Sequence, residues 1–129
     1  MRNSILLILV SITFIYCQNN IYAQGERLYQ TYCSNCHGLD GNGLKNLYPP
    51  LNNSDYLKEN NEKFACIILN GLEEEIVVNG KKYMMPMEGF KNLTDVDITN
   101  IINYVNSAWD NKLPETSIQE VKKNLESCN

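Results

Sequence analysis

Histidine is almost missing from this chain, in which His37 is the only one among 129 residues. A structural zinc site needs four Cys or His ligands, but only two of the five cysteines are closely spaced. The other three stand alone, at Cys17, Cys66 and Cys128. A Ser-His-Asp arrangement would also depend on this one imidazole. The scarcity argues against a zinc module or a hydrolase and makes the role of His37 the central question.

Basic residues are also in short supply. The chain has 11 lysines and arginines against 15 aspartates and glutamates, for a formal net charge of −4. Proteins that bind nucleic acids carry a basic face that neutralises phosphates, so we expect no nucleic-acid partner. An acidic surface suits a protein that docks briefly on basic patches of other proteins.

No apolar run in the chain reaches the roughly 20 residues that cross a bilayer. The longest, residues 5–16, follows the basic Arg2 and is cut short by polar residues. This segment ends in a small residue, Ala23, so residues 1–23 are typical of a secretory signal peptide. We therefore expect a single exported domain, residues 24–129, located in the periplasm.

Cys17 gives the same segment a second interpretation. A cysteine at this place can be the acceptor of a lipid anchor, but the bulky Tyr16 precedes it where a small residue is expected. Cleavage is the favoured interpretation. Membrane association would follow only if Cys17 were lipidated.

The chemistry of the chain centres on two cysteines and the histidine. Cys33 and Cys36 are separated by two residues, and His37 follows at once. This C-x-x-C-H pattern is the attachment signal of a c-type haem. Thiols about one helical turn apart can add to the two vinyl groups on one edge of the macrocycle, while the histidine reaches the iron. The sequence therefore predicts one covalent haem c with His37 as an iron ligand.

Two other interpretations of the C-x-x-C pair are a zinc half-site and a redox-active dithiol. The zinc site lacks further ligands at short spacing. A thioredoxin-like dithiol would follow a buried strand, whereas residues 25–32 are polar and helical in character.

A metal-bound histidine usually donates its second ring N–H to a carbonyl or carboxylate, which fixes the ring. The Pro49-Pro50 pair forms a rigid stretch downstream of the motif because both rings fix φ. The carbonyl of Pro49 is the candidate acceptor for His37.

Methionine is concentrated in one place. Three of the four methionines are Met84, Met85 and Met87, around Pro86. Methionine usually fills gaps in cores, but the proline interrupts any periodic core pattern, and a haem held by one histidine lacks a sixth ligand. A thioether in that position raises the potential of a haem and suits electron transfer.

Helical patterns predict helices over residues 25–32, 61–70, 94–109 and 117–126. The Asn79-Gly80 pair predicts a small hairpin over residues 76–83. The last helix, with Thr116 as its cap and Gln119 completing a capping box, belongs to an extension that starts at about residue 113. The extension would suit covering the domain or contacting a partner. A Cys66–Cys128 disulfide is possible in an exported protein.

These features together resemble the class I cytochromes c, specifically small bacterial monohaem ones. The elements that carry the resemblance are Gly25 and Tyr29 before the C-x-x-C-H motif, Pro49-Pro50-Leu51, Met85-Pro86, and a C-terminal helix with Tyr104 and Trp109. The resemblance implies an all-α fold in which helices wrap around one covalent haem. It also implies that the N- and C-terminal helices cross at a contact between glycine and an aromatic ring.

Carried over by position, the resemblance makes Cys33 and Cys36 the thioether attachments and His37 the proximal ligand. Pro49 would present its carbonyl to His37. Met85, directly before proline, would be the distal ligand, with Met84 and Met87 as the less favoured choices.

The expected function is that of a periplasmic single-electron carrier between respiratory proteins, with transient donor and acceptor partners and no catalytic residues of its own. One alternative is a haem subunit of a larger respiratory oxidoreductase. Another is a haem protein that reacts with peroxide or a gas after its methionine is displaced.

Overall fold

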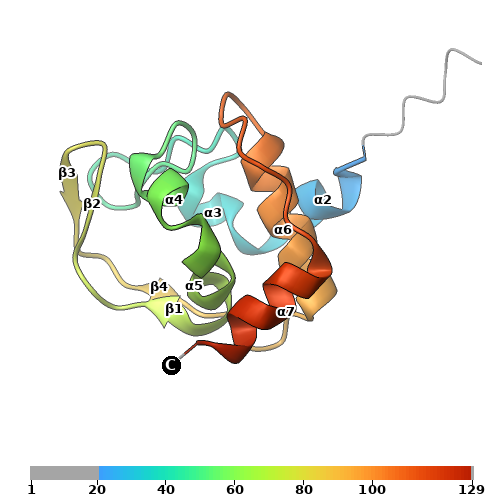
Figure 1. The fold of residues 1–129 in the computed structure, drawn as a ribbon. Helices are drawn as coiled ribbons and strands as arrows, with labels where there is room; N and C mark the ends of the chain where they lie inside the picture. The colour runs from blue at the N-terminus through green and yellow to red at the C-terminus, as the bar shows by residue number, and fades with distance from the viewer. Residues whose placement is uncertain (1–20, 129) are drawn as a thin grey trace, which may run out of the picture.

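The computed structural model describes residues 21–128, in which a small hairpin lies at one edge of a group of short helices (Figure 1). The helical elements are α2 (Ala23–Tyr32), α3 (Ser34–His37), α4 (Asp55–Glu59), the 3-10 turn η1 (Asn61–Lys63), α5 (Phe64–Asn70), α6 (Asp95–Ser107) and α7 (Ile118–Glu126). The strands are β1 (Gly71–Leu72), β2 (Ile76–Val78), β3 (Lys81–Tyr83) and β4 (Met87–Glu88). The expected all-α fold with a small hairpin is confirmed. Most of the proposed signal segment, including Cys17, lies outside the described residues.

Helices α2 and α6 cross at a point where the backbones touch. A Cβ atom on Gly25 would collide with the carbonyl oxygen of Asn100 and lie 2.7 Å from the Cβ of Tyr104. Glycine is therefore required for this close approach. The ring of Tyr104 also packs on that of Tyr29, with 5.3 Å between centroids. The crossing anchors α2, and hence the C-x-x-C-H motif that follows it, on the longest helix of the domain.

The expected helix over residues 94–109 ends earlier than the sequence pattern indicates. Thr94 caps α6 as predicted, in a capping box with Asp97, but the helix stops at Ser107 and Trp109 has a positive φ of 54°. The Trp109 ring still packs edge-on against Tyr29, with 5.5 Å between centroids. Trp109 therefore reaches this contact from the loop after the helix.

The predicted hairpin is present as β2 and β3, with Val77 opposite Lys82. Its central residues Asn79 and Gly80 have φ angles of 51° and 74°, as a two-residue hairpin turn of type I′ requires. A second pair of strands was not predicted. It joins β1 to β4 in antiparallel register, with Leu72 opposite Met87.

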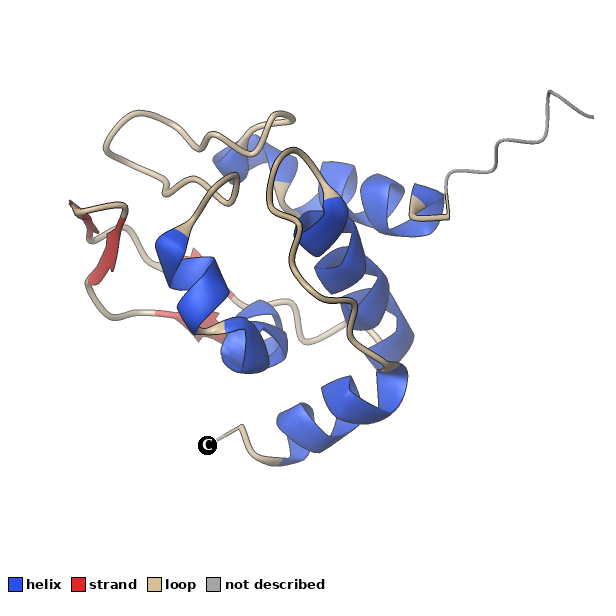
Figure 2. Ribbon diagram, turned by 45° about the horizontal axis from the view of Figure 1, so that its top comes forward, coloured by secondary structure: helices blue, strands red, loops and turns tan. Residues whose placement is uncertain are grey.

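The C-terminal extension packs on the domain. Figure 2 shows α7 lying across the ends of α5 and α6, where Val121 is fully buried. A disulfide joins Cys66 of α5 to Cys128. This is the pairing that the sequence had left as a possibility. The predicted cap is wrong by one residue: Ser117 caps α7 and Glu120 completes the capping box.

Hydrogen bonds from asparagine side chains of α6 hold the segment that connects α6 to α7. The side chain of Asn103 accepts a hydrogen bond from the Thr116 N–H at 2.8 Å and donates one to the Thr116 carbonyl at 3.0 Å. The buried Asn106 donates to the carbonyl of Pro114 at 2.8 Å. The extension thus covers the domain, which is one of the two roles expected for it. Within residues 21–128, no helix has the length and apolar character needed to cross a bilayer.

Candidate haem site

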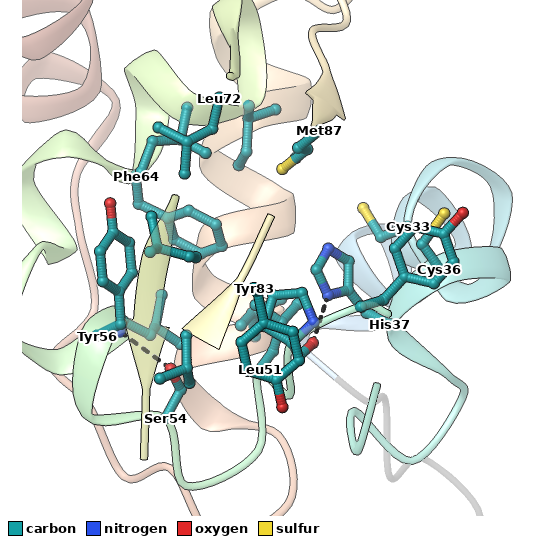
Figure 3. Close-up of a pocket in the computed structure, with 18 of the residues that line it drawn as sticks. Cys33, Cys36, His37, Leu51, Ser54, Tyr56, Phe64, Leu72, Tyr83 and Met87 are labelled. Atoms are coloured by element: carbon teal, nitrogen blue, oxygen red, sulfur yellow. Dashed lines mark hydrogen bonds between the residues drawn. The ribbon is translucent and has the colours of Figure 1, made fainter. Parts of the chain in front are cut away.

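A cavity of about 570 Å³ lies between the helices and the hairpin, within the roughly 300–1,000 Å³ of typical small-molecule and cofactor sites. Its walls are mainly apolar side chains, among them Leu51, Leu57, Phe64, Ile67, Ile68, Leu72, Val78, Ile101 and Val105. The two motif cysteines and His37 lie together at one side of it (Figure 3). The structure therefore brings the predicted attachment motif to the edge of an apolar chamber.

His37 is buried and its ring is fixed from behind. Its Nδ1 lies 2.9 Å from the carbonyl oxygen of Pro49, which is the contact predicted from the sequence. A carbonyl can only accept, so Nδ1 carries the proton and Nε2 is left with a free lone pair. Burial lowers the pKa of His37, while the bond to Pro49 raises it by a smaller amount. The imidazole is thus held neutral and ready to bind a metal through Nε2.

The loop after α3 places Pro49 behind the imidazole. Gly38 ends α3 with a φ of 78°, a conformation that glycine adopts without strain. Gly43 then donates its N–H to the carbonyl of His37 at 2.7 Å. A Cβ on Gly43 would collide with the carbonyl oxygen of Tyr48, so only glycine lets the loop close this tightly. The glycine-rich loop therefore brings the chain back to His37.

Cys33 and Cys36 are both free thiols that line the cavity. Burial, with a smaller contribution from the neighbouring Cys36, raises the pKa of the Cys33 thiol to about 12. Tyr29 packs behind the motif and donates its hydroxyl to the carbonyl of Gly38 at 2.6 Å. The α2–α6 crossing thereby supports the motif directly.

The three methionines differ in position. The side chain of Met84 is 73% exposed and that of Met85 is 45% exposed, whereas Met87 is half-buried. Met85 and Met87 both line the cavity, and Met84 does not. Figure 3 shows the sulfur of Met87 turned into the space that the His37 ring also faces.

Backbone pairing fixes the position of Met87. In β4 it lies opposite Leu72 of β1, and the Phe90 N–H donates to the carbonyl of Ile68 at 2.9 Å. A Cβ on Gly89 would collide with the backbone of Leu69 and Asn70, so β4 touches the end of α5. Met84 and Met85 lie between β3 and β4 and belong to neither strand. Gly89 is the residue of the sequence that could have indicated this close approach.

These residues fit a covalently attached haem. Two free thiols stand at the edge of an apolar cavity, an imidazole presents an unprotonated nitrogen to it, and a thioether faces the same space. Among residues 21–128, no group of three or more His, Cys, Asp or Glu side chains is placed to hold a metal ion. The fold and the site define a c-type cytochrome.

Comparison with known proteins gives the same answer. The family model described as Cytochrome c matches residues 22–109. Cytochrome c-552 of Thermus thermophilus is 33% identical over 93 residues, which are 67% of this chain and 69% of that protein. The chain therefore belongs to the cytochrome c family, whose members bind covalent haem c, and it is an electron carrier. The expectation of a haem-bearing electron-transfer protein is confirmed.

Two further relatives are much longer than this chain. The cytochrome c subunit of a quinone alcohol dehydrogenase from Gluconobacter oxydans (strain 621H) is 28% identical over 103 residues. The cytochrome subunit of a fructose dehydrogenase from Gluconobacter japonicus is 30% identical over 105 residues. The matched regions cover 77% of this chain but only 21% of either subunit.

Proposed function

We propose that this protein is an exported, periplasmic single-electron carrier whose haem iron is held by His37 and Met87. The observation that carries the proposal is the cavity itself, which has a fixed imidazole on one side and a strand-held thioether reaching into it. The haem supplies a one-electron iron couple when it is bound. His37 and Met87 would hold the iron, and an iron with two protein ligands would offer no open position to a substrate.

The surrounding residues have three tasks in this function. Cys33 and Cys36 would attach the haem covalently through their thiols. The Pro49 carbonyl holds the Nδ1 proton of His37, so the imidazole keeps one orientation in both oxidation states. The apolar walls exclude water, and a thioether ligand in such surroundings favours a high reduction potential.

Met87 is preferred here as the iron ligand. The Met-Pro pattern in the sequence favours Met85 instead. The β1–β4 pairing holds Met87 in one place, whereas Met85 is 45% exposed on the segment between β3 and β4. A ligand that must stay bound through repeated oxidation and reduction benefits from a preorganised position. Holding Met85 in the same way would need a rearrangement of that segment.

The function is tested on the haem-loaded protein by voltammetry and by proton NMR of the reduced state. We expect a reversible one-electron wave. A methionine methyl group facing the haem should be shifted strongly upfield by the ring current of the macrocycle. Carbon monoxide should bind only slowly or not at all to the reduced protein. Rapid binding of carbon monoxide and no shifted methyl resonance would instead support a gas-reactive or peroxide-reactive haem protein.

A second candidate is a haem subunit of a larger oxidoreductase. It is favoured by the similarity to the cytochrome subunits of two dehydrogenases. Purification of the tagged chain from its native membrane and periplasmic fractions tests it. Stoichiometric recovery with a dehydrogenase or oxidase would favour the subunit, and recovery of the chain alone would favour the freely diffusing carrier.

A further inference from the structure

The C-terminal extension lies beyond the part of the chain that matches the cytochrome c family model, which ends at residue 109. It nevertheless shares the core of the domain. Val121 of α7 is fully buried and belongs to the same cluster as Phe64, Ala65 and Ile68 of α5. The extension is thus an addition to the family domain that packs on the helix of the distal wall.

The extension is connected to α5 at two points. Near the start of α5, the buried Asn106 donates a hydrogen bond to the carbonyl of Pro114 in the extension at 2.8 Å. The same side chain exchanges hydrogen bonds of 3.0 and 3.4 Å with the side chain of Asn61 in η1, and η1 leads directly into α5. Within α5, Cys66 is bonded to Cys128. Both the start and the middle of α5 are therefore held to the extension.

Helix α5 lies between the extension and the haem cavity. Phe64, Ile67 and Ile68 line the cavity, and Figure 3 shows Phe64 across it from the motif cysteines. The helix is seven residues long, well below the roughly 12–15 residues at which an isolated helix becomes marginally stable. It therefore depends on its neighbours, and a change in the extension should reach the cavity wall.

Met87 is suspended from α5 through the backbone. Strand β1 follows α5 directly, and Leu72 of β1 lies opposite Met87 of β4. The Phe90 N–H then donates to the carbonyl of Ile68 at 2.9 Å. Covalent bonds and backbone hydrogen bonds thus form an unbroken path from the disulfide, through α5 and β1, to the methionine of the distal wall.

We propose that the C-terminal extension holds Met87 on the haem iron, and that the Cys66–Cys128 disulfide is a reducible fastening through which a protein dithiol opens the sixth position. The inference rests on the proposed ligation by Met87 and deepens it by assigning a regulation to that ligand. Cys66 and Cys128 are positioning residues, because neither lines the cavity. With the disulfide reduced, Met87 leaves the sixth position more often and exposes it to small ligands.

The opening step is a thiol–disulfide exchange. Both cysteines of the disulfide are half-buried, so their sulfurs are not sealed in the core. A thiolate of the partner attacks one sulfur and forms a mixed disulfide, and the partner's second thiol then displaces the other cysteine. The partner leaves as a disulfide, and Cys66 and Cys128 each keep a proton, so two electrons and two protons pass to this chain. The thioethers of Cys33 and Cys36 contain no S–S bond and are not cleaved.

The test measures carbon monoxide binding to the ferrous, haem-loaded protein without oxygen, at carbon monoxide concentrations where departure of the methionine limits the rate. In one sample, ascorbate reduces the iron and leaves the disulfide intact. In the other, dithiothreitol reduces both and is then removed. Binding should be roughly tenfold faster in the second sample, which corresponds to a barrier lower by about 1.4 kcal/mol. Hydrogen exchange of the Met87 amide should rise in the same sample.

Two matched variants separate the fastening from general loosening. The double variant Cys66→Ser with Cys128→Ser should bind carbon monoxide at the fast rate after either reductant. Gly25→Ala weakens the fold at the α2–α6 crossing and keeps the disulfide. Because local openings of separate regions are independent, its rate after ascorbate should stay within about twofold of the parent rate.

The outcomes separate this proposal from the proposed function. Slow binding at equal rates after ascorbate and dithiothreitol would overturn the reducible fastening and leave the carrier function standing. Gly25→Ala binding as fast as the double-serine variant would also overturn it, because any loss of stability would then open the site. Fast binding in the parent with its disulfide intact would overturn both the fastening and the closed sixth position of the proposed carrier.

Discussion

The two walls of the haem cavity are built by different means. On the proximal wall, the thiols and the imidazole belong to five consecutive residues, and the Pro49 carbonyl returns to them through a short glycine-rich loop. On the distal wall, β4 returns from beyond the β2–β3 hairpin to pair with β1, which directly follows α5, and a disulfide ties α5 to Cys128 near the C-terminus. The proximal geometry is therefore local, whereas the distal geometry depends on the tertiary fold.

This difference has a consequence for mutation. A local motif keeps its geometry as long as its own few residues are intact. A wall assembled from distant segments responds to changes well away from the cavity, because each segment is held by others.

The largest effect is expected from Met87→Ala. Loss of the thioether should remove the upfield methyl resonance and lower the midpoint potential by on the order of 100 mV or more, since axial ligands set haem potentials over a range of about 0.8 V. Met85→Ala, the matched control, should keep the methyl resonance and most of the potential. If Met85→Ala removes the resonance instead, the choice made from the Met-Pro pattern is right and the distal wall rearranges around the haem.

The methionines show where the sequence is sufficient and where it is not. The spacing of Cys33, Cys36 and His37 follows from covalent chemistry within one turn of chain, so it predicts the proximal site directly. The Pro49 carbonyl was also predictable, because a ligating histidine needs an acceptor nearby. Met84, Met85 and Met87 have the same chemistry, however, and only the fold distinguishes Met87, through its burial and the pairing of β4 with β1.

The other differences have the same origin. The β1–β4 pair is two residues long on each side, too short for an alternating pattern to be seen in the sequence. Trp109 keeps the spacing of α6 but lies beyond its end, because the helix stops at Ser107 and Ala108 is already extended. Disulfide pairing requires knowledge of which segments are close, and no spacing in the sequence brings Cys66 to Cys128.

The next effect concerns the disulfide that ties α7 to the distal wall. Replacing Cys66 and Cys128 together by serine removes a cross-link that spans 62 residues. The free energy of unfolding should fall by about 2–5 kcal/mol, as measured by guanidinium denaturation of the haem-loaded protein. Hydrogen exchange in α7 should rise more than in α2, because only α7 loses a tether. Equal rises in hydrogen exchange in the two helices would show that the disulfide stabilises the whole domain.

Two glycine variants compare the walls directly. Gly25→Ala adds a Cβ into the α2–α6 crossing, and Gly89→Ala adds one against the end of α5. Each should destabilise the fold by roughly 1–3 kcal/mol through overpacking. Gly89→Ala should also shift the methyl resonance of the distal methionine, because it displaces β4, whereas Gly25→Ala should leave that resonance in place.

Gly80→Ala serves as the control for a glycine substitution away from both walls. A Cβ there meets no atom within 4 Å, although the φ of 74° makes the alanine strained. Its cost should therefore appear in stability alone. A shift of the methyl resonance in Gly80→Ala would mean that the distal ligand responds to general loosening of the hairpin and not to the position of β4.

The smallest effect is expected at the N-terminus of α7. Glu120 accepts hydrogen bonds from the backbone and side chain of Ser117, and these lower the pKa of its carboxyl. A carboxyl with a lowered folded-state pKa stabilises the fold above its unfolded pKa, and this contribution is lost as the pH falls through the lower folded value. Glu120→Gln should therefore be slightly less stable than the parent at pH 7. The difference should vanish well below the usual glutamate pKa of about 4.3.

Glu126→Gln, at the other end of α7, is the matched control. It removes the same charge from the same helix at an exposed position outside the capping box. Thermal unfolding of the three proteins at pH 7 and near pH 3 gives the comparison. Because α7 is also tethered by the disulfide, the effect of Glu120→Gln should grow when Cys66 and Cys128 are serine. A capping effect that stays the same size without the disulfide would mean that the cap and the cross-link hold α7 independently.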